Sequence, residues 1–532
     1  MKETPHPPTT LGKRVDETLR SIPVVRVVYE MFKHPSKEGD FLLIVCSTIV
    51  MVAFLWVQLD GPYDTDGWFL LASGKQIVDN GLPYVNPWAY DGSYHVVIQQ
   101  WLHATLLYLA YSAAGYPGVD LFAAFIAAAT FAVMYATSRK LAKGAAPASC
   151  FAACAVAVVG CSYYMSVRPT MWTMMALCAV ICVCATSRQS ENKKLYLFLP
   201  AIMLVHAQLH MSMMWLDVFA AACFLLPWDA IERQQLKSSL KAYLKEKLPL
   251  ILAILGMAIA SCINPYGIDG ALYLFNSYGA AGYRSTINEL GNILNPNVGY
   301  LVWGAFILFA ALPTGFMLAE RRFAPFPFLV LWIVSLAAFV LHVRNIWIAG
   351  ISMMIITSTF LAEATPDRLA PPKPALPLLG VAIACGMLAY TAATADQNPD
   401  YTVKNHENNA VGWQQVERDI TPIANRILED DQQGRVYVSW ECINSCLEWK
   451  GVKVVFDTRP EIWEAGIAKT DVHAWRDFVD STMDDAALDS YIRDNHWDWY
   501  IVPRFLMDRY CENYNLQVEL DNGMYGLLRN AD

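Results

Sequence analysis

Residues 41–68 read FLLIVCSTIVMVAFLWVQLDGPYDTDGW, an apolar run that ends abruptly in an acidic segment. The apolar part, Phe41–Leu59, is long enough to cross about 30 Å of hydrocarbon as a helix. Residues 1–40 carry several Lys and Arg residues, and no small-residue cleavage site follows Leu59. We therefore expect a retained membrane anchor with residues 1–40 in the cytoplasm, rather than a signal peptide.

Similar apolar runs recur along the chain and predict about eleven membrane spans. After the first, they fall at Gly118–Thr137, Ala148–Tyr164, Thr170–Ala185, Leu195–Leu209, Met211–Leu226, Leu248–Ile263, Val298–Leu318, Pro325–Leu341, Ile346–Leu361 and Ala375–Thr394. Several of these runs are short, so their helices need little tilt or a locally thin bilayer. The predicted fold class is an α-helical polytopic membrane protein, with a transmembrane domain at residues 41–395.

The distribution of Lys and Arg gives the predicted orientation. Alternate connections carry clusters of basic residues, whereas the opposite connections carry single ones such as Lys75 and Arg168. Because basic loops stay in the cytoplasm, an odd number of spans places the C-terminal segment outside the cell membrane. The segment Ile98–Tyr116 is apolar enough to span, but counting it would reverse every later loop. We interpret it as an amphipathic helix on the outer membrane face, within a first outer loop of residues 60–117.

The C-terminal segment, residues 396–532, has the composition of a soluble domain. Residues 397–532 hold 25 acidic and 13 basic residues, so the acidity of the whole chain, with a net charge of −9, comes from this segment. The acidity gives no indication of a nucleic-acid partner. Strands are predicted at Arg435–Trp440, Val452–Asp457, Trp499–Pro503 and Met524–Arg529, and helices at Ala410–Asp431 and Asp484–Asn495, with Asp484 as an N-cap. This order indicates a small α/β sandwich.

The predicted topology gathers ionisable residues at the outer ends of the spans. They are Asp64 and Asp66 after the first span, Arg168, His206 and His210, Arg284, Glu289 and Arg344, with Tyr266 in the nearby Asn264–Gly267 turn. A single charge at such a place is most simply an interfacial anchor, because burying it in hydrocarbon is costly. Together, the two carboxylates and several cations suit a phosphate-bearing substrate, since Arg matches phosphate geometry and Asp can take a proton from a hydroxyl.

Several stretches resemble one family of membrane proteins. They include Asp64–Lys75 (DTDGWFLLASGK), Gly81–Pro83, Asn86–Tyr90, Gln100–Leu102, Arg168–Pro169, Ala207–His210, Asn264–Gly267, Val454–Arg459 and Trp497–Pro503, together with Glu289 and Arg344. They are similar to motifs of bacterial polytopic proteins of the GT-C type, which are related to protein mannosyltransferases and to aminoarabinose and lipopolysaccharide sugar transferases. At three positions the sequence departs from that pattern: Leu70 replaces a usual His, and Gln99-Gln100 replace a frequent His-Glu pair.

The resemblance implies an inverting hexosyl or pentosyl transferase in a bacterial cell membrane. Its donor would be a sugar on a polyprenyl-phosphate carrier, and its acceptor a glycan, lipid or protein outside the membrane. Asp64 is the first candidate for the general base and Asp66 the second, and either could bind a divalent ion (Mg or Mn). Arg168, His206, His210, Arg284 and Arg344 are the candidate phosphate contacts, with Glu289 and Tyr266 as further substrate contacts.

Two other functions compete with this one. A transporter would need polar groups inside the spans, for which Asp217 is the main candidate. A non-catalytic assembly or binding protein would work through its C-terminal domain, where Trp440, Trp449, Trp463 and Trp475 either bind glycan or pack in a core. Cys442 and Cys446 in the same domain predict a disulfide, because they lie four residues apart in a segment expected outside the cell.

Overall fold

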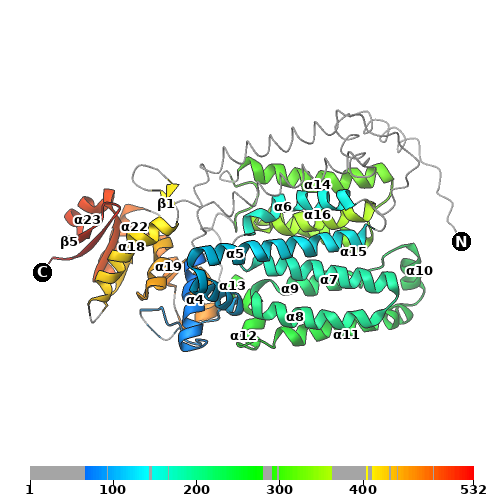
Figure 1. Cartoon of the computed structure of the whole chain (residues 1–532), viewed down its shortest axis with the longest axis horizontal. Helices are drawn as coiled ribbons and strands as arrows, with labels where there is room; N and C mark the ends of the chain where they lie inside the picture. Colours follow the sequence, from blue (N-terminus) through cyan, green and yellow to red (C-terminus); the bar gives the residue numbers. More distant parts are fainter. Residues whose placement is uncertain are drawn as a thin grey trace.

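The structure, a computed structural model, consists of a helical bundle and a C-terminal α/β domain that meet end to end (Figure 1). It describes residues 66–361 except 91, 93, 143–146, 166, 280–289 and 296–298, and residues 403–531 except 405–409, 412, 431–432, 440, 472 and 483. Several predicted features lie outside the described residues: the first and last spans, Asp64, Arg284 and Glu289.

The bundle is built from helices whose sequences are almost wholly apolar, as burial against neighbours and lipid requires. Its long members are α5 (Trp101–Leu141), α6 (Pro147–Cys161), α7 (Thr170–Ser190), α8 (Phe198–Leu209), α9 (Trp215–Cys223), α11 (Leu240–Ser261), α14 (Tyr300–Glu320), α15 (Phe326–Leu341) and α16 (Ile346–Leu361). Shorter elements connect them: η1 (Ser162–Tyr164), η2 (Lys193–Leu197), η3 (Met211–Met213), α10 (Ala230–Ser238), α12 (Ile268–Ala271), α13 (Tyr273–Gly279) and η6 (Val343–Asn345).

Each apolar run predicted to span between residues 118 and 361 contains a helix in the structure. Among the described residues, four helical stretches are long and apolar enough to cross a membrane: Trp101–Leu141, Thr170–Ser190, Leu301–Glu320 and Val343–Leu361. Shorter apolar helices lie at Ser149–Cys161, Met211–Cys223 and Phe326–Leu341. The chain is thus a multi-pass membrane protein, and the total of eleven spans stays a prediction.

Helix α5 is broken where the predicted outer-face helix should give way to a span. Ala114 and Gly115 leave the helical conformation, with a φ of +63° at Gly115, and Pro117 follows. Glycine tolerates this φ, and proline lacks the amide proton that a continuous helix needs. The helix predicted at Ile98–Tyr116 therefore exists as a separate arm of α5, and its orientation relative to the membrane stays a prediction.

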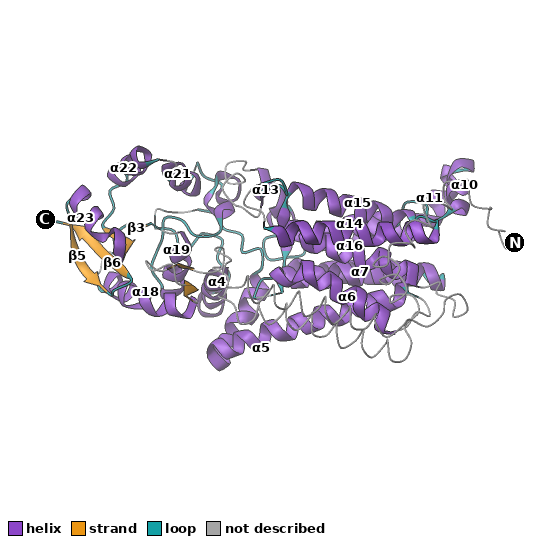
Figure 2. Cartoon of the chain, turned by 90° about the horizontal axis from the view of Figure 1, so that it is seen from above, coloured by secondary structure: helices purple, strands orange, loops and turns teal. Residues whose placement is uncertain are grey.

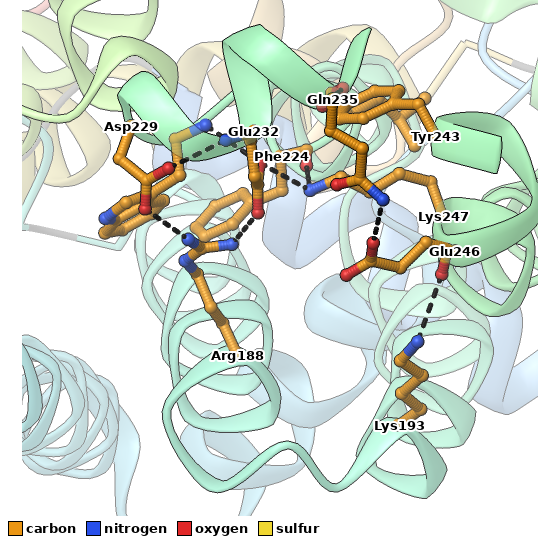
Figure 3. Close-up of polar contacts among 11 residues, drawn as sticks. Arg188, Lys193, Phe224, Asp229, Glu232, Gln235, Tyr243, Glu246 and Lys247 are labelled. Carbon is orange, nitrogen blue, oxygen red and sulfur yellow. Dashed lines mark hydrogen bonds and ion pairs between the residues drawn. The ribbon is translucent and has the colours of Figure 1, made fainter. Parts of the chain in front are cut away.

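The end of the bundle away from the C-terminal domain is held by an ion network (Figure 3). Helix α10 begins at the N-cap Asp229, whose carboxylate accepts the Glu232 amide proton at 2.9 Å. The buried Glu232 carboxylate pairs with Arg188 of α7 and, at 3.1 Å, with Lys247 of α11. Arg188 also reaches Asp229 at 3.2 Å and stacks on Trp228. Three helices are thereby tied together at a boundary where charged groups leave the hydrocarbon.

The C-terminal domain is a four-stranded sheet with helices on both faces (Figure 2). The strand order is β3 (Val436–Val438), β4 (Trp499–Pro503), β6 (Tyr525–Asn530) and β5 (Leu516–Asp521); β3 and β4 are parallel and the other pairs antiparallel. The helices are α18 (Trp413–Leu428), α19 (Glu441–Lys450), α20 (Ala465–Ala468), α21 (Ala474–Ser481), α22 (Asp485–Asp494) and α23 (Met507–Tyr514), with η8 at Pro460–Trp463 and η9 at Arg504–Leu506. A separate two-stranded pair joins β1 (Val403–Lys404) to β2 (Ala410–Val411).

The two faces of β4 show why the sheet is covered twice. Trp499 and Ile501 lie in the same core as Ile420 of α18, whereas Tyr500 and Val502 pack in a second core with residues of α22 and α23. All five residues of β4 are buried. This is the near-continuous apolar pattern of a strand between two layers. The predicted α/β sandwich is confirmed.

The structure corrects two predictions about this domain. Val452–Asp457 is not a strand of the sheet: Val454 forms a single parallel bridge with Ala89 of the first loop, and it donates to the Trp88 carbonyl at 2.8 Å. The segment is apolar because it is buried between the two domains. Strand β5 was not predicted: half of its six residues are polar, and all but Leu516 are at least partly exposed, as suits a sheet edge. The predicted Asp484 N-cap is confirmed, since its carboxylate accepts the Ala487 amide proton at 2.7 Å.

We expect Glu232→Gln to destabilise the bundle at neutral pH. Burial raises the pKa of Glu232, but hydrogen bonds from the Trp228 amide and Arg188, with the Lys247 charge, outweigh it and leave the pKa below its ordinary value of 4.5. A carboxylate with a lowered pKa stabilises the fold above its unfolded pKa and loses this effect as the pH falls. Thermal unfolding at pH 7 should show a loss of about 1.5–3 kcal/mol. The difference should shrink toward pH 3.5, and a constant difference would contradict this explanation.

Candidate functional site

The candidate site lies where the helical bundle meets the C-terminal domain. Helix α4 (Asp66–Asn80) starts with Asp66, and a carboxylate in the first turn is favoured by the helix dipole. The Asp66 Oδ2 atom lies 3.4 Å from the guanidinium of Arg168, a residue that precedes α7. The same guanidinium also packs over the Tyr164 ring. Both side chains keep some exposure, 25% for Asp66 and 12% for Arg168. The first outer loop and the end of the third predicted span therefore share a partly exposed ion pair.

His103 fixes the backbone beside Arg168. The indole Nε1 of Trp172 donates to His103 Nδ1 at 3.0 Å, and His103 Nε2 lies 2.6 Å from the Val167 carbonyl. An indole nitrogen can only donate, so His103 Nδ1 must be the acceptor. His103 Nε2 must then carry the ring proton and donate a hydrogen bond to the Val167 carbonyl. The buried His103 is therefore neutral and holds a single tautomer. It anchors the residue immediately before Arg168 to helix α5.

The two predicted histidines belong to a buried hydrogen-bonded chain. His206 Nδ1 lies 2.7 Å from Asp217 Oδ2, and its Nε2 lies 2.9 Å from the Thr173 hydroxyl. The same hydroxyl lies 2.7 Å from His210 Nδ1, and His210 Nε2 lies 3.0 Å from the Ser212 hydroxyl. Every member is buried or nearly so. Four helical segments, α7, α8, η3 and α9, are thus linked through one polar chain.

The proton positions in this chain follow from one assumption, an ionised Asp217. His206 Nδ1 then donates to Asp217, so His206 Nε2 accepts the single Thr173 proton. The Thr173 oxygen is left to accept from His210 Nδ1, and Ser212 donates to His210 Nε2. All four contacts are satisfied with both imidazoles neutral. A continuous chain of this kind is the stable way to keep polar groups inside a bundle.

Arg344 lies near both this chain and the C-terminal domain. It belongs to η6 between α15 and α16, close enough for its positive charge to reach His210 and Glu461. Glu461 belongs to η8 of the C-terminal domain, and its Oε1 atom accepts a 2.9 Å hydrogen bond from the Tyr273 hydroxyl of α13. Burial raises the pKa of Glu461, against the opposing effects of its own backbone amide, Tyr273 and Arg344. The C-terminal domain thus brings a carboxyl group to the same region.

A second carboxyl cluster of this domain touches α4 directly. The Arg459 guanidinium pairs with Asp457 and, at 2.9 Å, with Glu448, and all three side chains are buried. On its other side, the guanidinium lies 3.4 Å from the Ser73 hydroxyl and 4.7 Å from the centre of the Phe69 ring. Burial raises the pKa of Glu448 well above its ordinary value, and the neighbouring Asp457 charge adds to the increase. This direction favours a protonated Glu448, and Arg459 binds Asp457 through both its guanidinium and its backbone amide.

The structure also places Tyr266 and the three positions that depart from the family pattern. The Tyr266 hydroxyl donates to the Pro83 carbonyl at 3.1 Å, which ties its turn to the first loop. Leu70 is fully buried in the core, and Gln100 is buried at the start of α5. The Gln99 carbonyl accepts the Met211 amide proton at 2.9 Å, next to His210. The Gln99-Gln100 pair therefore lies beside the polar chain.

Several residues that complete the site were not among the predicted site residues. They are Thr173, Ser212, His103, Tyr273, Glu448, Arg459 and Glu461. Arg459 lies inside a stretch quoted for the family resemblance, but nothing in its local sequence indicates the Ser73 contact 386 residues away. Asp217 was considered for transport alone, and its partner His206 shows that it belongs to the polar chain.

Three further predictions concern a metal ion, four tryptophans and a disulfide. Among the described residues, no group of three His, Cys, Asp or Glu side chains could hold a metal ion, but Asp64 lies outside them, so the metal site stays a prediction. Trp463 and Trp475 are buried, so core packing is confirmed for these two tryptophans. Trp449 is partly buried and packs edge-on against Tyr111, and Trp440 lies outside the described residues. Cys446 lies buried on α19, but the Cys442 side chain is outside what the structure describes, and their disulfide stays a prediction.

Thr173→Val should destabilise the protein more than a matched control. Valine keeps the shape of threonine but leaves one nitrogen of each buried imidazole without its partner, at about 1–3 kcal/mol per nitrogen. Thr137→Val removes one buried hydroxyl that donates to the Cys178 carbonyl at 3.1 Å. Because that carbonyl lies inside α7, it keeps its helical hydrogen bond when the hydroxyl is removed. The control variant should therefore lose less stability. Thermal unfolding of both variants in the same detergent tests this, and equal losses would argue against the polar chain.

Glu448→Gln should leave the protein at least as stable as the parent at pH 7.5, because glutamine mimics a protonated carboxyl group. A carboxyl with a raised pKa makes the fold less stable as the pH rises above its unfolded pKa of about 4.3. The variant should therefore gain on the parent between pH 5 and pH 8. Asp457→Asn should lose about 3–5 kcal/mol, since it leaves Arg459 without its ionised partner. A loss of that size in Glu448→Gln would show that Glu448 is ionised.

Comparison with known proteins gives matches at the level of structure. No family model matches the sequence, and no curated protein does. The oligosaccharyltransferase AglB of Archaeoglobus fulgidus, in complex with an inhibitory peptide and dolichol-phosphate, aligns over 93% of this chain and 75% of its own, with a TM-score of 0.54 and 10% identity. ArnT of Cupriavidus metallidurans, bound to undecaprenyl phosphate, aligns over 93% of this chain and 99% of its own, with a TM-score of 0.51 and 12% identity. These matches cover both the bundle and the C-terminal domain, and they show that the chain has the GT-C fold.

Proposed function

We propose that this protein is an inverting glycosyltransferase that moves a sugar from a polyprenyl-phosphate carrier to an acceptor on the extracytoplasmic face. The observation that carries the proposal is the Asp66–Arg168 pair at the start of α4, in a chain with the GT-C fold. Two proteins of that fold were captured with dolichol-phosphate and undecaprenyl phosphate. By this proposal, the C-terminal domain is extracytoplasmic and residues 1–40 are cytoplasmic.

The proposed reaction divides the work between carboxylates and cations. The Asp64 carboxylate takes the proton of the acceptor hydroxyl, whose oxygen attacks the anomeric carbon from the face opposite the phosphate. The bond from that carbon to the phosphate oxygen breaks, and the carrier phosphate leaves with the electron pair. Arg168, Arg284 and Arg344 stabilise its charge, since guanidinium groups match phosphate oxygens.

Asp66 has a different part in this scheme. A carboxylate that pairs with a guanidinium is a weaker proton acceptor than one without such a partner. The 3.4 Å contact with Arg168 therefore suits Asp66 to orienting Arg168, and the proposal keeps Asp64 as the base. A divalent ion, Mg or Mn, is part of the proposal only as further neutralisation of the phosphate, with Asp64 and Asp66 as its carboxylate ligands. Chelation by EDTA should then lower the transfer rate, and added Mg should restore it.

The two aspartates can be tested with one assay and a matched control. Purified protein in lipid nanodiscs is supplied with a panel of polyprenyl-phosphate hexoses and pentoses and a membrane extract as acceptor, and release of the carrier phosphate is measured. Asp64→Asn should lower the rate by about 10²–10⁴-fold, the usual contribution of a general base. Asp66→Asn should lower it less, by about 10-fold, if it acts through Arg168.

The control is Asp79→Asn at the other end of α4, where Asp79 pairs with the exposed Lys75. Its rate should stay within about twofold of the parent, because an exposed pair one turn apart contributes little. Transfer at the parental rate by both Asp64→Asn and Asp66→Asn would refute the proposal. In that case, the buried Asp217–Ser212 chain would make transport the reading to test next.

A further inference from the structure

Helix α4 sets where Asp66 lies, so the contacts that hold this helix matter for the site. One side of α4 packs tightly on α5: a Cβ atom at Gly74 would come within 2.1 Å of the Ala104 carbonyl oxygen. Only glycine allows this approach of the two backbones. The contact fixes the distance between the two helices at Gly74, and residues 67–74 of α4 are all buried, so other parts of the protein cover the remaining sides of this helix.

Arg459 of the C-terminal domain contacts the face of α4 that carries Asp66. Phe69 and Ser73 follow Asp66 by three and seven residues, so the three side chains lie on one side of the helix. The guanidinium touches both, at 4.7 Å from the Phe69 ring centre and 3.4 Å from the Ser73 hydroxyl. It also lies 4.9 Å from the Trp88 ring centre in the loop after α4. One cation thus contacts the helix and the loop that follows it.

The C-terminal domain holds this guanidinium in a fixed place. Its Nε atom donates to Asp457 at 2.8 Å and its terminal nitrogen to Glu448 of α19 at 2.9 Å. Asp457 also accepts the Arg459 amide proton at 2.6 Å, so backbone and side chain are bound to one carboxylate. A planar guanidinium can bond to carboxylates along its edge and stack on rings with its faces at the same time. A lysine ammonium cannot do both.

We infer that Arg459 is a positioning residue, through which the C-terminal domain fixes α4 and therefore Asp66 relative to Arg168. The inference rests on the proposed function for its catalytic consequence, but the structural step stands on the contacts alone. The consequence is a defect in the chemical step with little change in substrate binding. A displacement of about 1 Å in a catalytic group can cost about 100-fold in rate.

The main test is Arg459→Lys, which keeps the charge beside Asp457 but loses the planar contact with Phe69, Ser73 and Trp88. We expect kcat to fall by about 10–100-fold with the KM for the polyprenyl-phosphate donor within about twofold of the parent. We also expect faster hydrogen–deuterium exchange in peptides covering residues 67–80. A structural role alone would lower the amount of folded protein without this separation of kcat from KM.

The matched control is Arg493→Lys. Arg493 also pairs with a carboxylate, Asp489 at 2.9 Å, and stacks on a ring, Tyr514 at 5.2 Å, but it is exposed on α22. Its kcat and the exchange of residues 67–80 should match the parent. If Arg459→Lys does not fold, Trp88→Leu removes one of the two stacked rings and keeps the apolar contact. It should give the same changes in kcat and exchange at a smaller size.

The outcomes separate the inference from the proposed function. Parental exchange of residues 67–80 in Arg459→Lys or, if that variant does not fold, in Trp88→Leu would overturn the inference, and so would parental kcat in an active enzyme. A parent protein without any transfer activity would overturn the proposed function instead. The exchange measurement would then still decide whether Arg459 fixes α4.

Discussion

Hydrocarbon cannot solvate a charge or an unpaired hydrogen-bonding group, and this constraint explains most of the arrangement of this protein. Charged side chains gather at the two ends of the bundle, as in the Arg188–Glu232 network at one end and the Asp66–Arg168 pair at the other. Where polar groups do enter the bundle, as Asp217 and His206 do, they are hydrogen-bonded to one another. The positions of the charged and polar side chains are therefore determined largely by where the apolar helices begin and end.

The C-terminal domain adds its own polar side chains to one end of the bundle. Its η8 segment places Glu461 against Tyr273, in the field of Arg344, and its Arg459 lies on α4. The buried Asp457, Glu448 and Arg459 side chains would be costly as isolated charges, but together they form a rigid cation with a matching carboxylate. The domain boundary is thus as tightly determined as the interior of either domain, and the candidate site draws on both.

The parts of the structure that the sequence predicts are those with local causes. Apolar runs located the long apolar helices between Gly118 and Leu361, because hydropathy decides them, but not the short α10, α12 and α13. Strand β4 was predicted residue for residue because all of it is buried. The contact of Thr173 with two histidines depends on how α7 packs against α8, which no local pattern encodes. Val454 lies in an apolar stretch, which predicts a buried strand, and it is indeed buried. Its bridge partner, however, is Ala89 in the first loop. Periodicity identifies buried faces, but it does not identify what buries them.

The same constraint explains how two proteins with 10% and 12% identity can share this fold over most of the chain. A span must be apolar and long enough, and many sequences satisfy both conditions, so the bundle can keep its shape while almost every residue changes. A buried hydrogen-bonded group has far fewer substitutes, because each change leaves a partner unsatisfied. Arg459 and Thr173 each form hydrogen bonds with several partners, so we expect few other residues to be tolerated at these two positions. The apolar helices around them supply the fold, and the polar ends that both domains share hold the candidate site.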